Sequence, residues 1–131
     1  MTGVYINCRL IPFIMLILAG VKHHETRTRD VFKALYGQRV ALIETGRGPV
    51  PMVRGYATIG RPRRVPYSDT DAREAAQILG TPYDIQPGAE KVFYPLVRVR
   101  RCRPYPLLAD HVNHGRSYCT FTKPGKGGAT L

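Results

Sequence analysis

An abrupt change from apolar to charged residues near the N-terminus constrains the fold of this chain more than any other feature. Residues 10–19 are all apolar, whereas Lys, His, Glu and Arg dominate residues 22–29. Pro12 suits the first turn of a helix, and Gly20 suits the position just after its last turn. The sequence therefore predicts a helix over residues 9–19. Because this helix is apolar on nearly all sides, we expect other elements to cover most of it.

The charged segment 22–28 predicts a strand that is polar on both faces. Alternation places Lys22, His24, Thr26 and Thr28 on one face and His23, Glu25 and Arg27 on the other. A strand without an apolar face lies at the edge of a sheet or lines a cleft that is open to water. Lys22 and Glu25 can meet only where such a strand twists or bulges, whereas Glu25 can pair with Arg27 on its own face.

The other predicted elements are short and are separated by glycine and proline. Strands are expected at 4–7, 40–44, 52–59, 92–102 and 115–122, with 46–49 as the turn of a hairpin. Asp30 is expected to cap a helical turn at 31–35, and further helix is expected at 69–79, followed by an extended connector at 81–88. Loops are expected at 60–66 and 104–106, where prolines remove ladder hydrogen bonds.

These elements predict a single α+β domain over residues 4–122 with a flexible C-terminal tail at 123–131. The connections resemble a meander. We therefore expect an antiparallel, partly closed β-barrel of about six strands with two or three packed helices.

Arginine dominates the charge of the chain and forms two clusters. The net charge is +11, from 20 Lys and Arg against 9 Asp and Glu. The clusters are Arg61, Arg63 and Arg64, and Arg98, Arg100, Arg101 and Arg103; Tyr56, Tyr67, Tyr94 and Tyr105 stand near them. Guanidinium groups bind phosphates and aromatic rings stack on bases, so this composition is typical of a surface for single-stranded nucleic acid. A basic surface that serves solubility alone is the alternative.

The arginines of the second cluster are expected to form a wall. In a regular strand, Arg98 and Arg100 lie on one face, opposite Val97 and Val99.

Neither a metal site nor a disulfide framework is indicated. The cysteines, Cys8, Cys102 and Cys119, are widely spaced and form no Cys-x-x-Cys pair. His23 and His24 point to opposite faces of a strand, and His111 and His114 have only Asp110 as a nearby acid. We therefore expect no metal and no other cofactor, and free thiols in the reducing environment of the cytoplasm.

The apolar run invites two further interpretations, which the sequence disfavours. A membrane span requires about 20 apolar residues, and the run 10–19 is far shorter. A signal peptide needs a positively charged segment before its apolar run, but residues 4–7 resemble a strand and carry no charge. We expect no association with a membrane.

The charged strand carries a recognisable motif. Gly20, Lys22, Glu25 and Arg27 match the Gly-x-Lys-x-x-Glu-x-Arg signature of the ASCH domain, which belongs to a superfamily of β-barrels similar to the PUA domain. Residues 37–42 resemble the second block of that family. Residues 91–96 resemble its C-terminal block, although Tyr94 stands where the family often has Trp. The resemblance covers about residues 4–121 and implies a PUA-like barrel.

The resemblance also implies a cleft beside the motif strand, a surface suggested for RNA binding in this superfamily. Our first hypothesis is therefore a protein that binds RNA or a nucleotide-type ligand. Its predicted binding residues are Lys22, Glu25, Arg27, Arg61, Arg63, Arg64, Tyr94, Arg98 and Arg100.

The second hypothesis is a small hydrolase, either an N4-acylcytidine amidohydrolase or a ribonuclease, that uses Lys22 with Glu25 or Glu74 as catalytic residues. The amidohydrolases of this superfamily have Thr three residues after the Lys. Here that position is Glu25, with Thr26 next to it, and this departure favours binding over hydrolysis.

Overall fold

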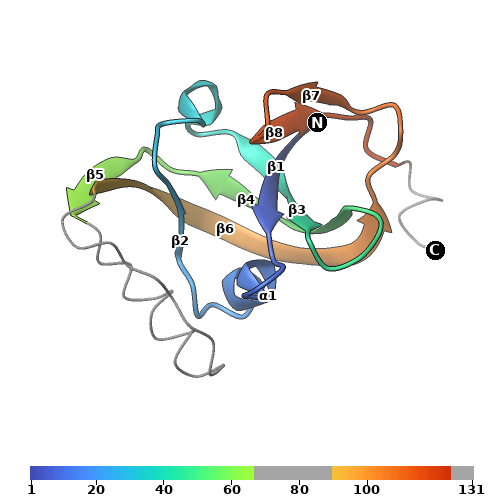
Figure 1. Ribbon diagram of the computed structural model, residues 1–131, viewed down its shortest axis with the longest axis horizontal. Coiled ribbons are helices and arrows are strands. Elements are labelled where there is room, and N and C mark those ends of the chain that lie inside the picture. Colours follow the sequence, from blue (N-terminus) through green and yellow to red (C-terminus); the bar gives the residue numbers. More distant parts are fainter. Residues whose placement is uncertain (67–89, 125–131) are drawn as a thin grey trace.

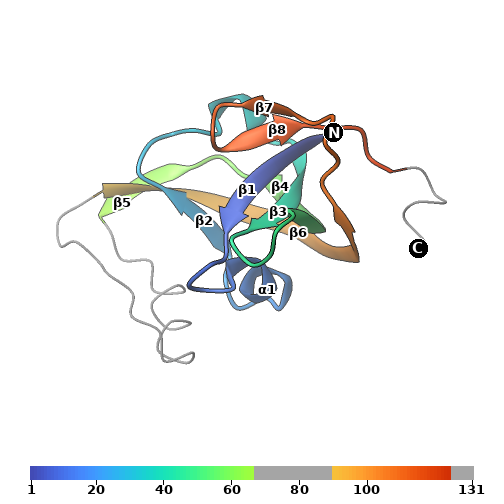
Figure 2. The same cartoon turned by 45° about the vertical axis from the view of Figure 1, so that its right-hand side comes forward.

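The structure is a computed structural model that describes residues 1–66 and 90–124. Its main feature is one strongly curled sheet (Figures 1 and 2). The elements in chain order are β1 (Thr2–Asn7), α1 (Phe13–Leu18), β2 (His24–Arg27), a 3-10 turn (Lys33–Leu35), β3 (Arg39–Thr45), β4 (Met52–Ile59), β5 (Arg63–Pro66), β6 (Glu90–Pro106), β7 (Val112–His114) and β8 (Tyr118–Thr120).

The sheet is mixed rather than antiparallel throughout. Its strand order is β2-β6-β4-β3-β1-β8-β7, and β5 pairs with β6 as well. β1 and β3 are parallel, whereas all other neighbours are antiparallel. A parallel pair needs a crossover connection, and residues 8–38, which include α1 and β2, provide it. The prediction of a partly closed barrel is confirmed, but the described residues form eight strands, and the purely antiparallel arrangement was wrong.

The hairpin of β3 and β4 is confirmed, and it forms the centre of the structure. Val40 and Leu42 belong to one buried cluster, whereas Ala41 and Ile43 belong to another on the opposite face of β3. The first cluster includes side chains of α1, β1 and β6, and the second includes Tyr56, Tyr105 and Phe121. The central strand is therefore buried on both faces.

Helix α1 is shorter than predicted, and it begins at Phe13 rather than near residue 9. Its end is as expected: Gly20 has φ +75°, the Gly20 N–H donates to the Ile17 carbonyl (3.1 Å), and the Val21 N–H donates to the Leu16 carbonyl (2.9 Å). These two bonds form a Schellman motif. The expectation of cover on most sides was wrong, because Ile14 and Ile17 are buried whereas Met15 is 53% exposed.

Three predictions near prolines and glycines were wrong. β6 continues to Pro106, since it carries extra residues opposite β4 around Pro104, where the register shifts and no regular ladder bond is required. Residues 63–66 form β5 instead of a loop, because this strand pairs with β6 alone and tolerates Pro66 at its end. The strand predicted at 115–122 is shortened to β8, because its first residues form a turn in which Gly115 has φ +73°, and this turn joins β8 to β7 in a hairpin.

The predicted helix at 69–79, the connector at 81–88, Tyr67, Glu74 and most of the tail lie outside the described residues. No helix within residues 1–66 and 90–124 is both long and apolar enough to cross a membrane.

Gly55 of β4 allows the sheet to pack closely against α1. A Cβ atom at this position would lie 2.5 Å from the carbonyl oxygen of Arg100 and 2.7 Å from Leu18 Cδ2. We expect Gly55→Ala to lower the free energy of unfolding by about 2 to 3 kcal/mol, because the backbone of β6 must move. Chemical denaturation measures this change.

Gly48→Ala is the matched control, since a Cβ atom there meets no atom within 4 Å. Its effect should stay within about 0.5 kcal/mol. Equal stability of the two variants would contradict the close packing of β4 between α1 and β6.

Candidate functional site in the seam between β1 and β2

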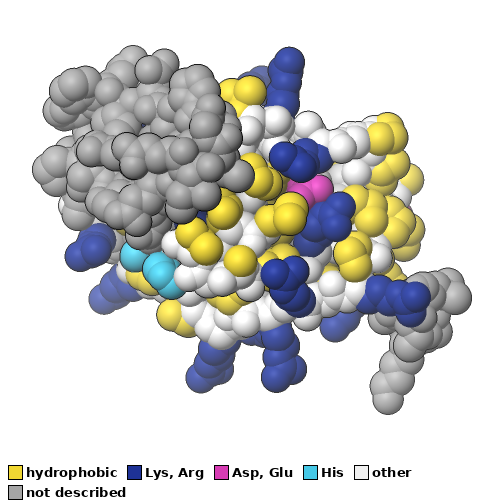
Figure 3. Space-filling view, turned by 90° about the horizontal axis from the view of Figure 1, so that it is seen from below, with side chains coloured by type: hydrophobic (Ala, Val, Ile, Leu, Met, Phe, Trp, Pro, Cys, Tyr) yellow, Lys and Arg dark blue, Asp and Glu magenta, His cyan; other side chains and the backbone are white. Residues whose placement is uncertain are grey.

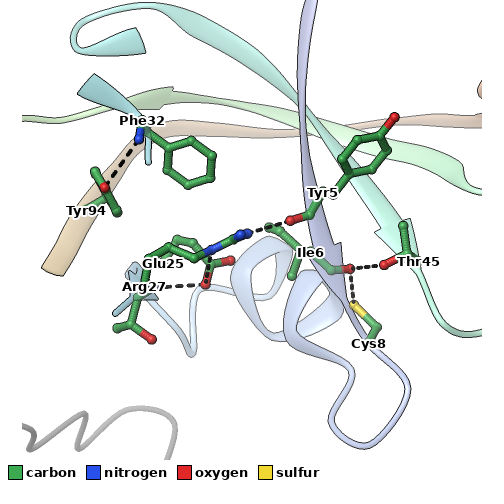
Figure 4. Close-up of polar contacts among 9 residues, drawn as sticks. Tyr5, Ile6, Cys8, Glu25, Arg27, Phe32, Thr45 and Tyr94 are labelled. Carbon is green, nitrogen blue, oxygen red and sulfur yellow. Dashed lines mark hydrogen bonds and ion pairs between the residues drawn. The ribbon is translucent and has the colours of Figure 1, made fainter. Parts of the chain in front are cut away.

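The motif strand β2 lies at an edge of the sheet, as the sequence predicts. It pairs with β6 on one side only, with Glu25 opposite Tyr94 and Arg27 opposite Val92. Its other side faces β1 across a gap, which we call the seam (Figure 4). No backbone hydrogen bond joins β1 to β2 in the described part of the chain.

Arg27 spans the seam with its side chain. Its Nη2 donates a hydrogen bond to the carbonyl oxygen of Tyr5 on β1 (2.5 Å), and its guanidinium lies 4.9 Å from the ring centroid of Phe32 (Figure 4). Its Nε lies 3.9 Å from Glu25 Oε1, so the predicted pairing of Glu25 with Arg27 on one face is confirmed. Arg27 therefore joins the two strands without closing the space between them.

Glu25 is buried and has one unsatisfied oxygen. The residue is 7% exposed, and its Oε1 accepts a hydrogen bond from the Thr26 N–H (2.9 Å). Its Oε2 is fully buried and has no hydrogen-bond partner. The other buried glutamate of the described residues, Glu44, accepts a hydrogen bond from Arg54 Nε at 3.0 Å. Since an unsatisfied buried carboxylate oxygen is costly, Glu25 Oε2 marks a place for a ligand donor or a water.

Lys22 is buried beside the seam rather than on the strand itself. β2 begins at His24, and Lys22 belongs to the turn after α1, where its N–H donates to the Leu16 carbonyl (3.1 Å). The residue is 2% exposed, and its Nζ lies 5.3 Å from the ring centroid of Phe13. The alternation of a strand therefore does not determine where the Lys22 side chain points. Both Lys22 and Glu25 of the motif are buried.

A pocket of about 350 Å³ occupies the seam. Its lining residues come from β1, α1, β2, the end of β3 and the turn between β7 and β8: Tyr5, Ile6, Asn7, Phe13, Glu25, Arg27, Thr45 and Arg116. Glu25, Arg27 and Arg116 are its charged groups. Sequence reasoning missed Phe13, Thr45 and Arg116, because only the folded sheet brings these distant segments together.

A second pocket, of about 260 Å³, contains the first arginine cluster. It is lined by Asp30, Tyr36, Arg61, Pro62, Arg63, Arg64 and Val92. Val92 pairs with Arg27 on one side and with Arg64 on the other, so this pocket lies across β6 from the motif strand. β6 and β2 therefore separate the first arginine cluster from the seam.

Asp30 lines the second pocket and also contacts Tyr94, the residue of β6 that pairs with Glu25. It makes no cap hydrogen bond to the 3-10 turn, so that prediction was wrong. Its carboxylate accepts hydrogen bonds from the hydroxyls of Tyr94 (2.7 Å) and Tyr36. Burial raises the pKa of Asp30, but these two bonds and the charges of Lys33 and Arg64 outweigh it and lower that pKa. Burial and the bond to Asp30 raise the pKa of Tyr36 to about 12.

The tyrosines of the predicted aromatic platform that the structure describes are not at the surface. Tyr94 is completely buried, its ring packs edge-on against Phe32 at 5.0 Å, and its hydroxyl accepts from the Phe32 N–H at 3.4 Å (Figure 4). Tyr56 and Tyr105 are also buried, with their hydroxyls 2.7 Å apart. Tyr94, a predicted binding residue, is therefore a core residue in this structure, and the three hydroxyls find partners inside the fold.

The second arginine cluster does not line the seam. Arg98 and Arg100 lie with Arg39 in a separate pocket of about 440 Å³. The predicted alternation was wrong here, because Arg98 has φ +53° and lies in a bulge of β6, and Val97 is 48% exposed.

The histidines and cysteines make no metal cluster in the described residues. His111 Nδ1 lies 2.7 Å from the Leu108 carbonyl oxygen, and His114 Nε2 lies 3.1 Å from Thr120 Oγ1. All three cysteines are free.

Comparison with known proteins identifies the fold. No family model and no curated protein matches the sequence. The crystal structure of ASCH from Zymomonas mobilis matches with a TM-score of 0.57 and 18% identity, over 98% of this chain and 91% of that chain. Two ZmASCH mutant proteins match with TM-scores of 0.57 and 0.52, at 18% and 20% identity, over 93% and 80% of this chain and 87% and 76% of theirs. The curled mixed sheet thus has the fold of these ASCH proteins, and the predicted resemblance to ASCH domains is confirmed at the level of the fold.

The bond across the seam generates a prediction about stability. We expect Arg27→Met to lower the free energy of unfolding by about 1 to 3 kcal/mol, because the Tyr5 carbonyl loses a charged donor and Glu25 loses its cation. Arg29→Met is the control, since Arg29 is exposed and lies on the same segment. Thermal and chemical denaturation compare the two, and equal stabilities would show that the seam does not depend on Arg27.

The lowered pKa of Asp30 generates a prediction about pH. The folded pKa lies below the unfolded value of about 3.9, so the carboxylate stabilises the fold above that pH, and the contribution is lost as the pH falls through the folded pKa. Asp30→Asn should therefore be less stable than the parent at neutral pH, and the difference should shrink below about pH 4. Denaturation over a pH series tests this, and a difference that is constant with pH would contradict it.

Proposed function

We propose that this protein is a member of the ASCH domain family that binds RNA or a nucleotide-type ligand in the seam pocket. The observation that carries the proposal is Glu25 Oε2, a buried carboxylate oxygen without a partner, in a pocket that also holds Arg27 and Arg116. A ligand that satisfies this site needs a hydrogen-bond donor for Glu25 and negative charge for the guanidinium groups. A nucleotide has both, in the amino or imino group of its base and in its phosphate.

The size and lining of the seam pocket support a small planar ligand. A volume of about 350 Å³ lies within the range of small-molecule sites. Phe13 and Ile6 give it apolar walls, and Thr45 adds a hydroxyl. An ionised Glu25 can only accept hydrogen bonds, so it favours a base edge that carries N–H groups.

The charge distribution supports a polyanionic chain as the source of that nucleotide. Figure 3 shows Lys and Arg side chains spread over one face of the molecule with little acidic surface between them. Arg61, Arg63 and Arg64 lie across β6 from Arg27, where they can hold phosphates of a chain that continues beyond the nucleotide in the seam. A net charge of +11 attracts RNA at long range. We place this activity in the cytoplasm, as the free cysteines suggest.

Hydrolysis is the second candidate, and the burial of both Lys22 and Glu25 favours it. A carboxylate with a free buried oxygen can accept a proton from a bound water or hydroxyl, and a buried lysine can stabilise negative charge that develops on the substrate. The substrates to test are N4-acetylcytidine and single-stranded RNA. Lys22→Met and Glu25→Gln should abolish turnover, and turnover that survives both would remove this candidate.

Binding is tested with a fluorescently labelled single-stranded RNA at low salt. We expect Glu25→Gln to weaken binding by about tenfold. The glutamine amide is neutral, and its NH₂ group is a donor where the ligand also presents a donor. Asp110→Asn removes a carboxylate from an exposed position and should leave the affinity unchanged. No binding of the parent protein at low salt, or equal affinities of the two variants, would overturn the proposal.

The salt dependence of the same binding gives a separate prediction for Arg116. Each phosphate contact with a single strand contributes about 0.7 to the slope of log K against log salt concentration. Arg116→Ala should reduce that slope by about this amount, because Arg116 is exposed in the turn before β8 and lines the seam pocket. An unchanged slope would remove Arg116 from the binding site.

A further inference from the structure

A bulge in the long strand β6 contributes to a third pocket, away from the seam and from the first arginine cluster. The pocket has a volume of about 440 Å³ and is lined by Arg39, Arg98, Val99 and Arg100. It shares no lining residue with the seam pocket or with the pocket of the first arginine cluster. We propose that this arginine pocket is an independent binding site for a phosphate group.

The backbone at Arg98 is the first reason. Thr58 pairs with Val97 and Tyr56 pairs with Arg100, so β6 advances three residues where β4 advances two. Arg98 lies at this extra position, and it is the only non-glycine residue of the described chain with a positive φ. A left-handed conformation costs an L-residue about 1 to 2 kcal/mol, and glycine adopts it without that strain. The chain thus places a guanidinium where glycine would be better for the fold alone.

The position of Arg39 is the second reason. Its Nη1 donates a hydrogen bond to the carbonyl oxygen of Arg98 (3.0 Å), and its guanidinium lies 5.9 Å from the ring centroid of Tyr56. A guanidinium has five N–H donors, so several remain for a ligand after the bond to the bulge. The bulge and the ring hold Arg39 in place before any ligand arrives.

The charge balance is the third reason. No acidic side chain lines this pocket among the described residues, and none of its three arginines forms an ion pair within residues 1–66 and 90–124. Like charges gathered in one pocket repel each other, and a bound anion removes that repulsion. Planar guanidinium groups match the oxygens of phosphate in pairs, which favours phosphate over other anions.

The phosphate can belong to a small molecule or to the backbone of a nucleic acid, and two probes distinguish these sources. Inorganic pyrophosphate represents the small molecule, and a short oligo-uridylate with a 5′-hydroxyl end represents the backbone. Calorimetric titration at low salt measures the affinity for each. The Nε–H signals of Arg39, Arg98 and Arg100 in the NMR spectrum show whether the probe binds in this pocket.

Arg98→Gly is the most informative variant, because glycine keeps the left-handed backbone and removes only the side chain. We expect it to be at least as stable as the parent and to bind the effective probe about tenfold more weakly. Arg101→Ala is the control: it removes the same charge from an exposed position on β6 outside the pocket. It should reduce the affinity much less.

Each outcome decides one point. A loss confined to pyrophosphate assigns the pocket to a small molecule, and a loss that includes the oligonucleotide assigns it to a nucleic acid backbone. Equal effects of Arg98→Gly and Arg101→Ala, or no binding of either probe, would overturn the proposal. Glu25→Gln should leave pyrophosphate binding unchanged, so failure of the seam proposal is distinguishable from failure of this one.

Discussion

The side chain of Arg27 spans the gap between β1 and β2 where a closed barrel would have a ladder of backbone hydrogen bonds. This replacement has two consequences. The Tyr5 carbonyl, on the side of β1 that β8 no longer covers, obtains a donor, which a buried backbone group requires. At the same time the two strands stay apart, because a long side chain needs more room than a direct bond between backbones. The seam pocket exists because the barrel is closed by a side chain at this point.

The spacing of the motif follows from this geometry. Gly20 ends α1 in a left-handed conformation and turns the chain toward the sheet, and Lys22 is buried in that turn. Glu25 and Arg27 are two residues apart on β2, so their side chains share the face that lines the pocket. Arg27 is engaged by Tyr5 and Phe32, and it approaches Glu25 only through Oε1. The second carboxylate oxygen is left without a hydrogen-bond partner as a result.

Local signals in the sequence predicted much of the fold but little of the site. The alternation of residues 52–59, the continuous apolar run of residues 40–43 and the glycine after α1 each determine structure within a few residues, and all three predictions were confirmed. The parallel pairing of β1 with β3 depends on contacts between segments far apart in the chain, which no local pattern encodes. The same holds for Arg116, which reaches the seam through the hairpin of β7 and β8, and for Tyr94, whose hydroxyl is satisfied inside the fold by Asp30.

The separation of the arginines changes what the net charge means. In the sequence, both arginine clusters and the nearby tyrosines were assigned to one surface for nucleic acid. In the fold, Arg61, Arg63 and Arg64 lie across β6 from the motif strand, whereas Arg98 and Arg100 gather with Arg39 at the bulge. Three of the tyrosines that would connect them, Tyr56, Tyr94 and Tyr105, are buried. The positive charge that appears as a single excess in the composition is therefore distributed over separate pockets. A ligand that neutralises all of it must be long enough to reach from one pocket to the next, and a single nucleotide in the seam is not.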